Sequence, residues 1–167
     1  DMEVSTLVVG TALEYGVTDN LTLGIIAPIV TANSRFHLAF EKAAAAQHPA
    51  FSQIDFVKAA ENAAVSKGYQ PFGDWNGTGL GDVELGMKLR FLNTQSWAMA
   101  TKAGVRLPTG RADDPNHLTD VAFGDGQTDT GATLLIDYQG LPNLLLNTQV
   151  KYTWQLPDLQ TMRVPQQ

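Results

Sequence analysis

Ten charged side chains of both signs recur on one side of an alternating pattern, and these are the side chains with which this sequence could do chemistry. Between Asp82 and Phe91 the charges take even positions, whereas Val, Leu, Met and Phe take odd positions. Successive side chains of a β-strand point to opposite faces, so the pattern predicts a strand with one ionic and one apolar face. The full ionic set is Glu14, Asp82, Glu84, Lys88, Arg90, Lys102, Arg106, Asp129, Asp137 and Lys151.

This set fits ion pairing and contact with dissolved solutes better than catalysis. The chain has no cysteine, no G-x-S-x-G or H-E-x-x-H motif and no phosphate-binding loop. Glu14 and Asp82 would form a carboxylate pair only if their strands adjoin, and His37 and His48 are too scattered for a metal site. We therefore expect no enzyme activity, no metal and no cofactor, and the net charge of -6 argues against nucleic acid as a partner.

The charged positions lie in six predicted strands that together form an all-β, antiparallel up-and-down meander. Short turns are expected at 18–20, 93–96 and 139–142, with long connections at 31–79 and 109–126. Alternate connections of a meander lie at the same end, so the short turns share one rim, as in transmembrane β-barrels. The predicted strands lie near 4–17, 21–30, 80–92, 97–108, 127–138 and 143–155, within one segment over 1–167.

In a barrel the apolar face meets lipid and the ionic face lines a wet lumen, so we expect the ten charges to face the lumen. No apolar run is long enough for a transmembrane helix. Glycines on the polar side fit a concave wall, and Pro28 should end or bulge its strand. The aromatics expected at the two membrane interfaces are Tyr15, Phe91, Trp97, Tyr138, Tyr152 and Trp154.

Four of the ten charges form a predicted basic patch on one hairpin, namely Lys88, Arg90, Lys102 and Arg106. Counting from the turn at 93–96 places Lys88 near Lys102, and Arg90 opposite Ala98–Ala100. Like charges this close need partners, and the candidates are Glu84, Asp82 and Asp137.

The two long connections differ in composition. A helical insertion is expected over 35–76, with an alanine-rich stretch at 36–47 followed by a helix that has a Ser52–Asp55 capping box and a stop at Gly68. It would be either an external decoration or a lid or plug at the mouth. The second connection is rich in aspartate but has no calcium-loop spacing, so we expect a solvated acidic loop.

Several motifs resemble an outer-membrane β-barrel family associated with the meta-pathway of phenol degradation. They are EYGVTDNLTLGIIAPIV, GTGLGDVELGMKLRFL, AGVRLPTG and GDGQTDTGATLLIDY. The resemblance implies a channel in the bacterial outer membrane for small, often aromatic or hydrophobic, solutes, with the lipid bilayer as a partner and no defined catalytic residues. The long insertion and the last residue, which is not aromatic, depart from the family pattern.

Six strands are too few to close a barrel. We therefore expect either that the remainder of a longer chain completes it or that several copies do so together. Because the sequence starts at Asp1, without Met, we expect a mature or excised segment. Two other functions stay open, namely a soluble periplasmic lipocalin-like binder and a structural or adhesive surface barrel without transport.

Overall fold

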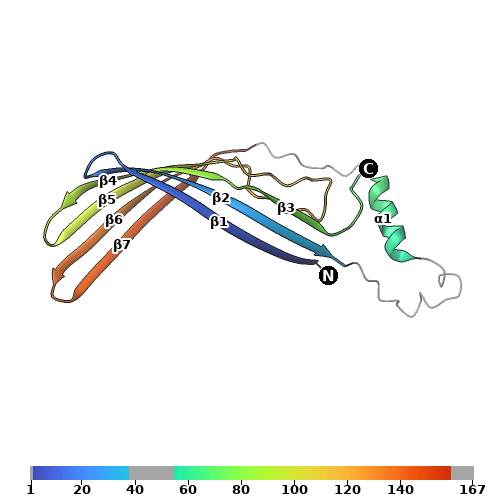
Figure 1. Ribbon diagram of the computed structural model, residues 1–167, viewed down its shortest axis with the longest axis horizontal. Coiled ribbons are helices and arrows are strands. Elements are labelled where there is room, and N and C mark those ends of the chain that lie inside the picture. The colour runs from blue at the N-terminus through green and yellow to red at the C-terminus, as the bar shows by residue number, and fades with distance from the viewer. Residues whose placement is uncertain (1, 38–54, 159–167) are drawn as a thin grey trace.

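A computed structural model describes residues 2–37 and 55–158 and shows one curled antiparallel sheet with a short helix (Figure 1). The strands are long, slender and bent in the same sense, so the sheet forms an open arch. Its elements are β1 (Met2–Gly16), β2 (Leu21–Phe36), α1 (Phe56–Ser66), β3 (Trp75–Leu80), β4 (Val83–Asn93), β5 (Trp97–Leu107), β6 (Asp129–Leu141) and β7 (Leu144–Gln155).

The strand order β1-β2-β4-β5-β6-β7 follows the chain, which confirms the predicted all-β meander. The short turns at 17–20, 94–96 and 142–143 lie at one end, which we call the turn rim. The ends of β2 and β5, from which the two long connections start, lie at the opposite end, the loop rim. The last short turn comes later than predicted, and its Asn143 adopts a left-handed φ of 60° that Asn tolerates better than most residues.

A seventh strand and a longer β2 correct the prediction that residues 31–79 form a loop. β2 pairs with β4 from Leu21 to Ile26 and then with β3 from Ile29 to Ser34. β3 and β4 therefore act as one long strand with a break at residues 81–82. Pro28 does not end β2 as expected, because it falls where β2 changes partners and its missing N–H is not needed for either of those ladders.

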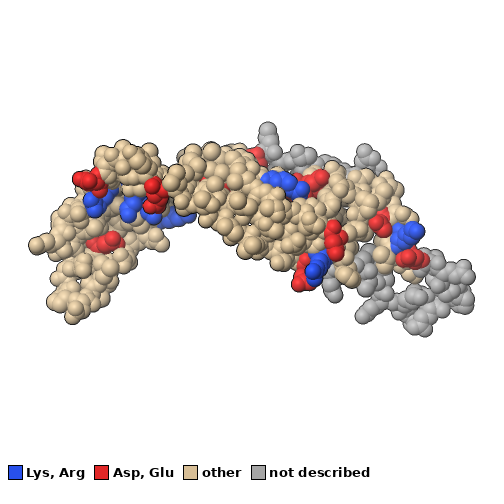
Figure 2. Space-filling model, viewed as in Figure 1, with Lys and Arg blue, Asp and Glu red and all other residues tan. Residues whose placement is uncertain are grey.

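The two faces of the sheet meet different surroundings. The apolar face carries large exposed side chains along its whole length, including Leu13 at 67% and Val150 at 62%. Figure 2 shows broad uncharged surface over the strands, with the charged groups gathered into a few clusters. Among the described residues only Val30, Ala32 and Ala100 are buried apolar side chains. The sheet therefore has almost no dry centre of its own.

The insertion contributes one described helix beyond the loop rim. Asp55 caps α1 by accepting a hydrogen bond from the Lys58 N–H at 3.1 Å, and Gly68 follows the helix with φ 82°, as the predicted stop requires. Asp55 is thus the cap itself rather than the third residue of a capping box. Ser52, His48 and most of the alanine-rich stretch lie outside the described residues. Since Phe36 belongs to β2 and Trp75 to β3, the insertion is shorter than 35–76 at both ends.

Candidate functional site

The strand register arranges the ionic face in rows that run across the sheet. Lys88 lies directly opposite Lys102, Lys102 opposite Thr133, and Thr133 opposite Lys151. We call Lys88, Lys102 and Lys151 the lysine row. The predicted proximity of Lys88 and Lys102 is confirmed, as is the placement of Arg90 opposite Ala100. Within 2–37 and 55–158, no ion pair neutralises any of the three lysines.

Next to the lysine row runs a belt of glycines. Gly24 pairs with Gly86, Gly86 with Gly104, and Gly104 with Gly131, so four adjacent strands expose bare backbone at the same level. These four residues are the glycine belt. A Cβ at Gly104 would lie 2.9 Å from the Leu85 carbonyl oxygen, too close for any other residue without a shift. The belt leaves a trough across the face, bordered on its other side by Glu84, Arg106 and Asp129.

The lysine row and the glycine belt line an open hollow of about 710 Å³. All six long strands, namely β1, β2, β4, β5, β6 and β7, contribute residues to it. A hollow shared by six strands of one bent sheet marks this face as the concave one. It collects seven of the ten predicted charged residues: Glu14, Glu84, Lys88, Lys102, Arg106, Asp129 and Lys151. Three acids and four bases give these seven a formal charge of +1, in a chain whose net charge is -6.

The remaining three charged residues, Arg90, Asp82 and Asp137, lie outside the hollow. Among the described ion pairs, neither Asp82 nor Asp137 neutralises the basic patch as predicted. Arg90 instead fixes the first turn, donating from Nη2 to the Asp19 carbonyl at 2.8 Å and from Nε to Asn20 Oδ1 at 3.2 Å. Asp137 accepts a 2.6 Å hydrogen bond from the Asn147 side chain. Asp82 binds only backbone N–H groups among its described partners.

Three motifs that are far apart in the chain meet at the break between β3 and β4. Asp82 accepts from the N–H of Gly110 at 3.0 Å and from the N–H of Asp125 at 3.2 Å. Thr109 donates its hydroxyl to the Gly81 carbonyl at 2.8 Å and accepts from the Val83 N–H at 2.9 Å. The GLGD, LPTG and GDGQTD motifs are visible in the sequence, but nothing in the sequence indicates that they contact one another at a single junction.

Arg106 completes this junction from the hollow side. Its guanidinium pairs with both Asp125 and Asp129, and the Asp129 side chain is only 11% exposed. The predicted partner Glu84 is its register neighbour on β4, but the described ion pairs go to these two aspartates. Arg106 is therefore neutralised locally, whereas the lysine row is not.

Residues 108–128, which we call the inner loop, lie against the concave face near the loop rim. Phe123 packs over β3, where a Cβ at Gly79 would be 3.0 Å from its ring, and contacts Trp75 at 6.0 Å between ring centroids. Arg111 stacks over Trp75 at 4.8 Å and pairs with Asp120, whose side chain is 1% exposed. The expectation of a solvated acidic loop is therefore wrong for its central part, because its aspartates bind Arg and backbone N–H groups.

Desolvation raises the pKa of Asp113 in the inner loop above its ordinary value, and a hydrogen bond with Asp120 adds to this. The chain thus holds carboxylates close together here, with one arginine to offset them. Within the described ranges, no cluster of three or more His, Asp or Glu has a geometry that fits a metal ion. Likewise, no described helix combines the length and the apolar character needed to cross a bilayer.

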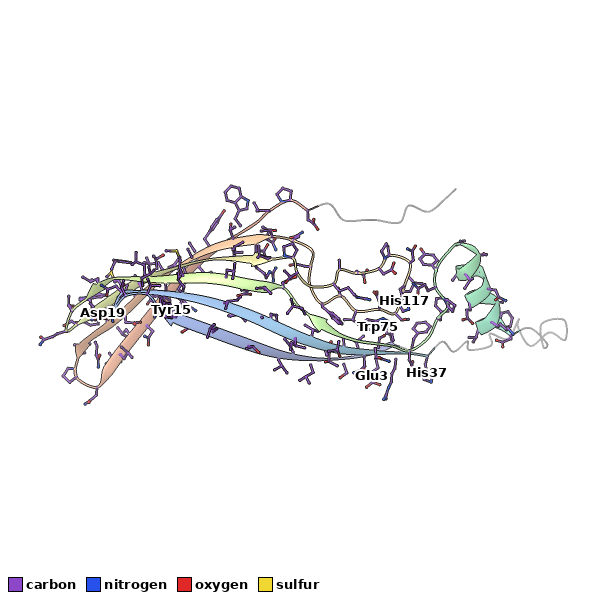
Figure 3. The ribbon with its side chains drawn as sticks, turned by 45° about the horizontal axis from the view of Figure 1, so that its top comes forward. Glu3, Tyr15, Asp19, His37, Trp75 and His117 are labelled. Atoms are coloured by element: carbon purple, nitrogen blue, oxygen red, sulfur yellow. The ribbon has the colours of Figure 1, made fainter. Side chains whose placement is uncertain are left out.

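The six aromatic residues predicted for the interfaces lie towards the two ends of the sheet. Near the turn rim, the rings of Trp97 and Tyr138 lie 4.5 Å apart between centroids and are tilted by 45°. Tyr15 is 70% exposed at the same end (Figure 3). Phe91 is 55% exposed beside an irregularity of β4. Towards the loop rim, Tyr152 and Trp154 are 70% and 62% exposed on the edge strand β7.

A comparison with protein families decides the relationship that the motifs indicated. The family described as "Putative MetA-pathway of phenol degradation" matches residues 2–161. The chain belongs to this family. The matched range spans the junction, the hollow and the insertion. The search of curated proteins found no match to the chain.

Proposed function

We propose that this member of the phenol-degradation family forms the wall of an outer-membrane channel through which small solutes diffuse passively. One observation carries the proposal. The apolar face of the sheet is convex and exposed, whereas the concave face is ionic and hollowed. Large apolar side chains on a convex sheet need a non-aqueous environment, and charges on a concave wall need water.

The same observation weighs against a lipocalin-like binder. Such a binder would enclose its ligand between apolar side chains and turn its charges outward. Here Leu13 and Val150 point away from the hollow, and Lys102 and Lys151 line it. The family description, which refers to phenol degradation, is compatible with solutes that are small and aromatic or hydrophobic.

The lysine row gives the proposed channel a preference among solutes. Two lysines face each other across β4 and β5, an arrangement that costs stability because like charges repel. Unpaired cations beside water attract anions and raise their local concentration. We expect phenolates, aromatic carboxylates and small inorganic anions to pass more readily than cations of the same size.

The proposal also requires that the open edges of the sheet be closed. Among the described strands, β1 and β7 each have a partner on only one side, so each presents a row of N–H and C=O groups that no described strand pairs. Inside a bilayer such groups must be satisfied by other strands. Either further strands of a longer chain or other copies of the chain would supply them.

The test begins with location and then measures conduction. Cells that express the full protein are fractionated, and the protein should appear in the outer membrane and require detergent for extraction. Purified protein in planar bilayers should then conduct ions with anion preference. Extraction without detergent would refute the membrane assignment. A membrane-bound protein that conducts nothing would instead favour a structural or adhesive surface barrel.

A further inference from the structure

The inner loop covers the concave face of the sheet at the loop rim, which narrows any path that runs along that face. Val30, Ala32 and Ser34 lie on the same side of β2 as the hollow, yet they are 6%, 0% and 1% exposed. The corresponding side of β3 consists of Trp75, Gly77 and Gly79, which contact Phe123 or lie where it packs. The hollow thus gives way, along β2, to a zone where the concave face is filled.

The loop is fixed in this place by the sheet rather than by its own contacts alone. Asp82 accepts backbone hydrogen bonds from both ends of the loop, at Gly110 and Asp125. A Cβ at Gly110 would lie 2.9 Å from Asp82 Oδ1, so the carboxylate is enclosed by close backbone. Asp82 is only 9% exposed, which shields these hydrogen bonds from competing water.

Glycines on both partners allow this close approach. A Cβ at Gly77 would lie 2.6 Å from the Trp75 ring, and one at Gly79 would touch Phe123 at 3.0 Å. Large side chains at these two positions would push Phe123 and the loop away from the wall. β3 is thus shaped to receive the loop, although its sequence WNGTGL is poor in strand-forming residues.

We propose that the inner loop is the size-selecting constriction of the channel, and that Asp82 is the positioning residue that holds it against the wall. This inference rests on the proposed channel function. The two features act at different places along the channel. The lysine row sets the preference for anions in the hollow, and the inner loop sets the size limit for solutes at the loop rim. Figure 3 places Trp75 and His117 together at that rim, far from Tyr15 and Asp19.

The experiment compares two variants that should release the inner loop from the sheet, called the releasing variants, with a matched control in the full protein. Asp82→Ala removes both carboxylate acceptors that hold the loop, and Phe123→Ala keeps the junction but removes the ring that fills the space over β3. Asp19→Asn removes one negative charge at the turn rim and serves as the control. Liposome swelling with neutral mono-, di- and trisaccharides reports the size limit, and planar bilayers report conductance and ion selectivity.

Both releasing variants should raise conductance and should increase the trisaccharide rate several-fold relative to the monosaccharide rate. In Phe123→Ala, which removes no charge, the anion preference set by the lysine row should stay as in the wild type, which a general loss of structure would not achieve. Trypsin should also cleave after Arg111 faster in Asp82→Ala than in the wild type, because its stacking on Trp75 depends on the docked loop. Asp19→Asn should match the wild type in all these measurements.

Three outcomes are distinguishable. A wild-type protein without any conductance refutes the channel and this inference with it. A conducting wild type whose size limit is unchanged in both releasing variants refutes the constriction alone. If Asp82→Ala fails to reach the membrane, Phe123→Ala decides the question by itself, because the hydrogen bonds of Asp82 remain in that variant.

Discussion

Replacing Lys102 by Gln tests whether the concave face is the conducting face. Lys102 occupies the middle of the lysine row and lines a hollow of about 710 Å³. A sphere of that volume has a radius of about 5.5 Å, which we take as the distance between the Nζ charge and a passing ion. In water with a dielectric constant of about 80, one unit charge at that distance changes the energy of an ion by ~0.75 kcal/mol.

Salt reduces this energy in a way that can be calculated. At 0.1 M salt, with a Debye length of about 10 Å, the change falls to ~0.4 kcal/mol for each ion. Anion and cation shift in opposite directions, so losing the charge should lower the anion-to-cation permeability ratio about fourfold. At 1 M salt, with a Debye length of about 3 Å, the same change should lower it only ~1.5-fold.

The assay is the reversal potential of the full protein in planar bilayers under a KCl gradient. Glu84→Gln, on the same face, should shift the ratio in the opposite direction, and Lys58→Gln on α1, away from the hollow, should not shift it. A shift of equal size at both salt concentrations would show that Lys102 acts by supporting the wall. No shift at either concentration would refute the assignment of this face as the conducting one.

Three further predictions address the wall. Gly104→Ala should lower the unfolding free energy by about 1–3 kcal/mol, because its Cβ would meet a backbone carbonyl at 2.9 Å, whereas Gly86→Ala, with 3.6 Å of room, should cost less than about 1 kcal/mol in the same urea titration. Val9→Arg, at the middle of β1, should destabilise the membrane-inserted protein by about 2–4 kcal/mol in a folding titration with lipid vesicles, and an equal effect of Ala12→Arg, on the hollow side, would contradict the lipid-facing assignment. Desolvation raises the pKa of Asp113, so the folded protein binds a proton at this carboxyl more tightly than the unfolded chain does. The stability that this proton contributes is lost as pH rises through the raised pKa, so Asp113→Asn should increase the urea midpoint more at pH 7 than at pH 4. A larger increase at pH 4 than at pH 7 would contradict this sign.

The long alternating strands could be predicted because each keeps the same two environments from end to end. From Val83 to Leu89 in β4 and from Ala103 to Leu107 in β5, the odd positions are apolar and the even positions line the hollow. The distal half of β2 was missed because its inner face changes environment. Val30, Ala32 and Ser34 are buried next to the part of β3 over which Trp75 and Phe123 pack, so small residues replace the charges that marked the ionic face elsewhere.

The junction at Asp82 could not be predicted because alternation identifies the face of a residue but not its contacts across a loop. Asp82 looked like one more charge on the ionic face, yet it binds the N–H groups of Gly110 and Asp125. The density of aspartates in the inner loop indicated solvation, and only the positions of Arg106 and Arg111 show that these carboxylates are paired. A signal was present in the glycines that flank each motif, since close backbone packing needs them.

The direction of the outermost strands has a consequence for how the barrel is completed. If β3 and β4 are counted as one strand, the sheet has six strands that alternate in direction, so β1 and β7 run in opposite directions. Any set of strands that closes the barrel between β1 and β7 with antiparallel pairing throughout must therefore contain an even number of strands. A second copy rotated about the barrel axis satisfies this parity, because it presents its β1 to β7 of the first copy in the antiparallel sense. An odd addition would leave one seam parallel, and the meander could not close with uniform pairing.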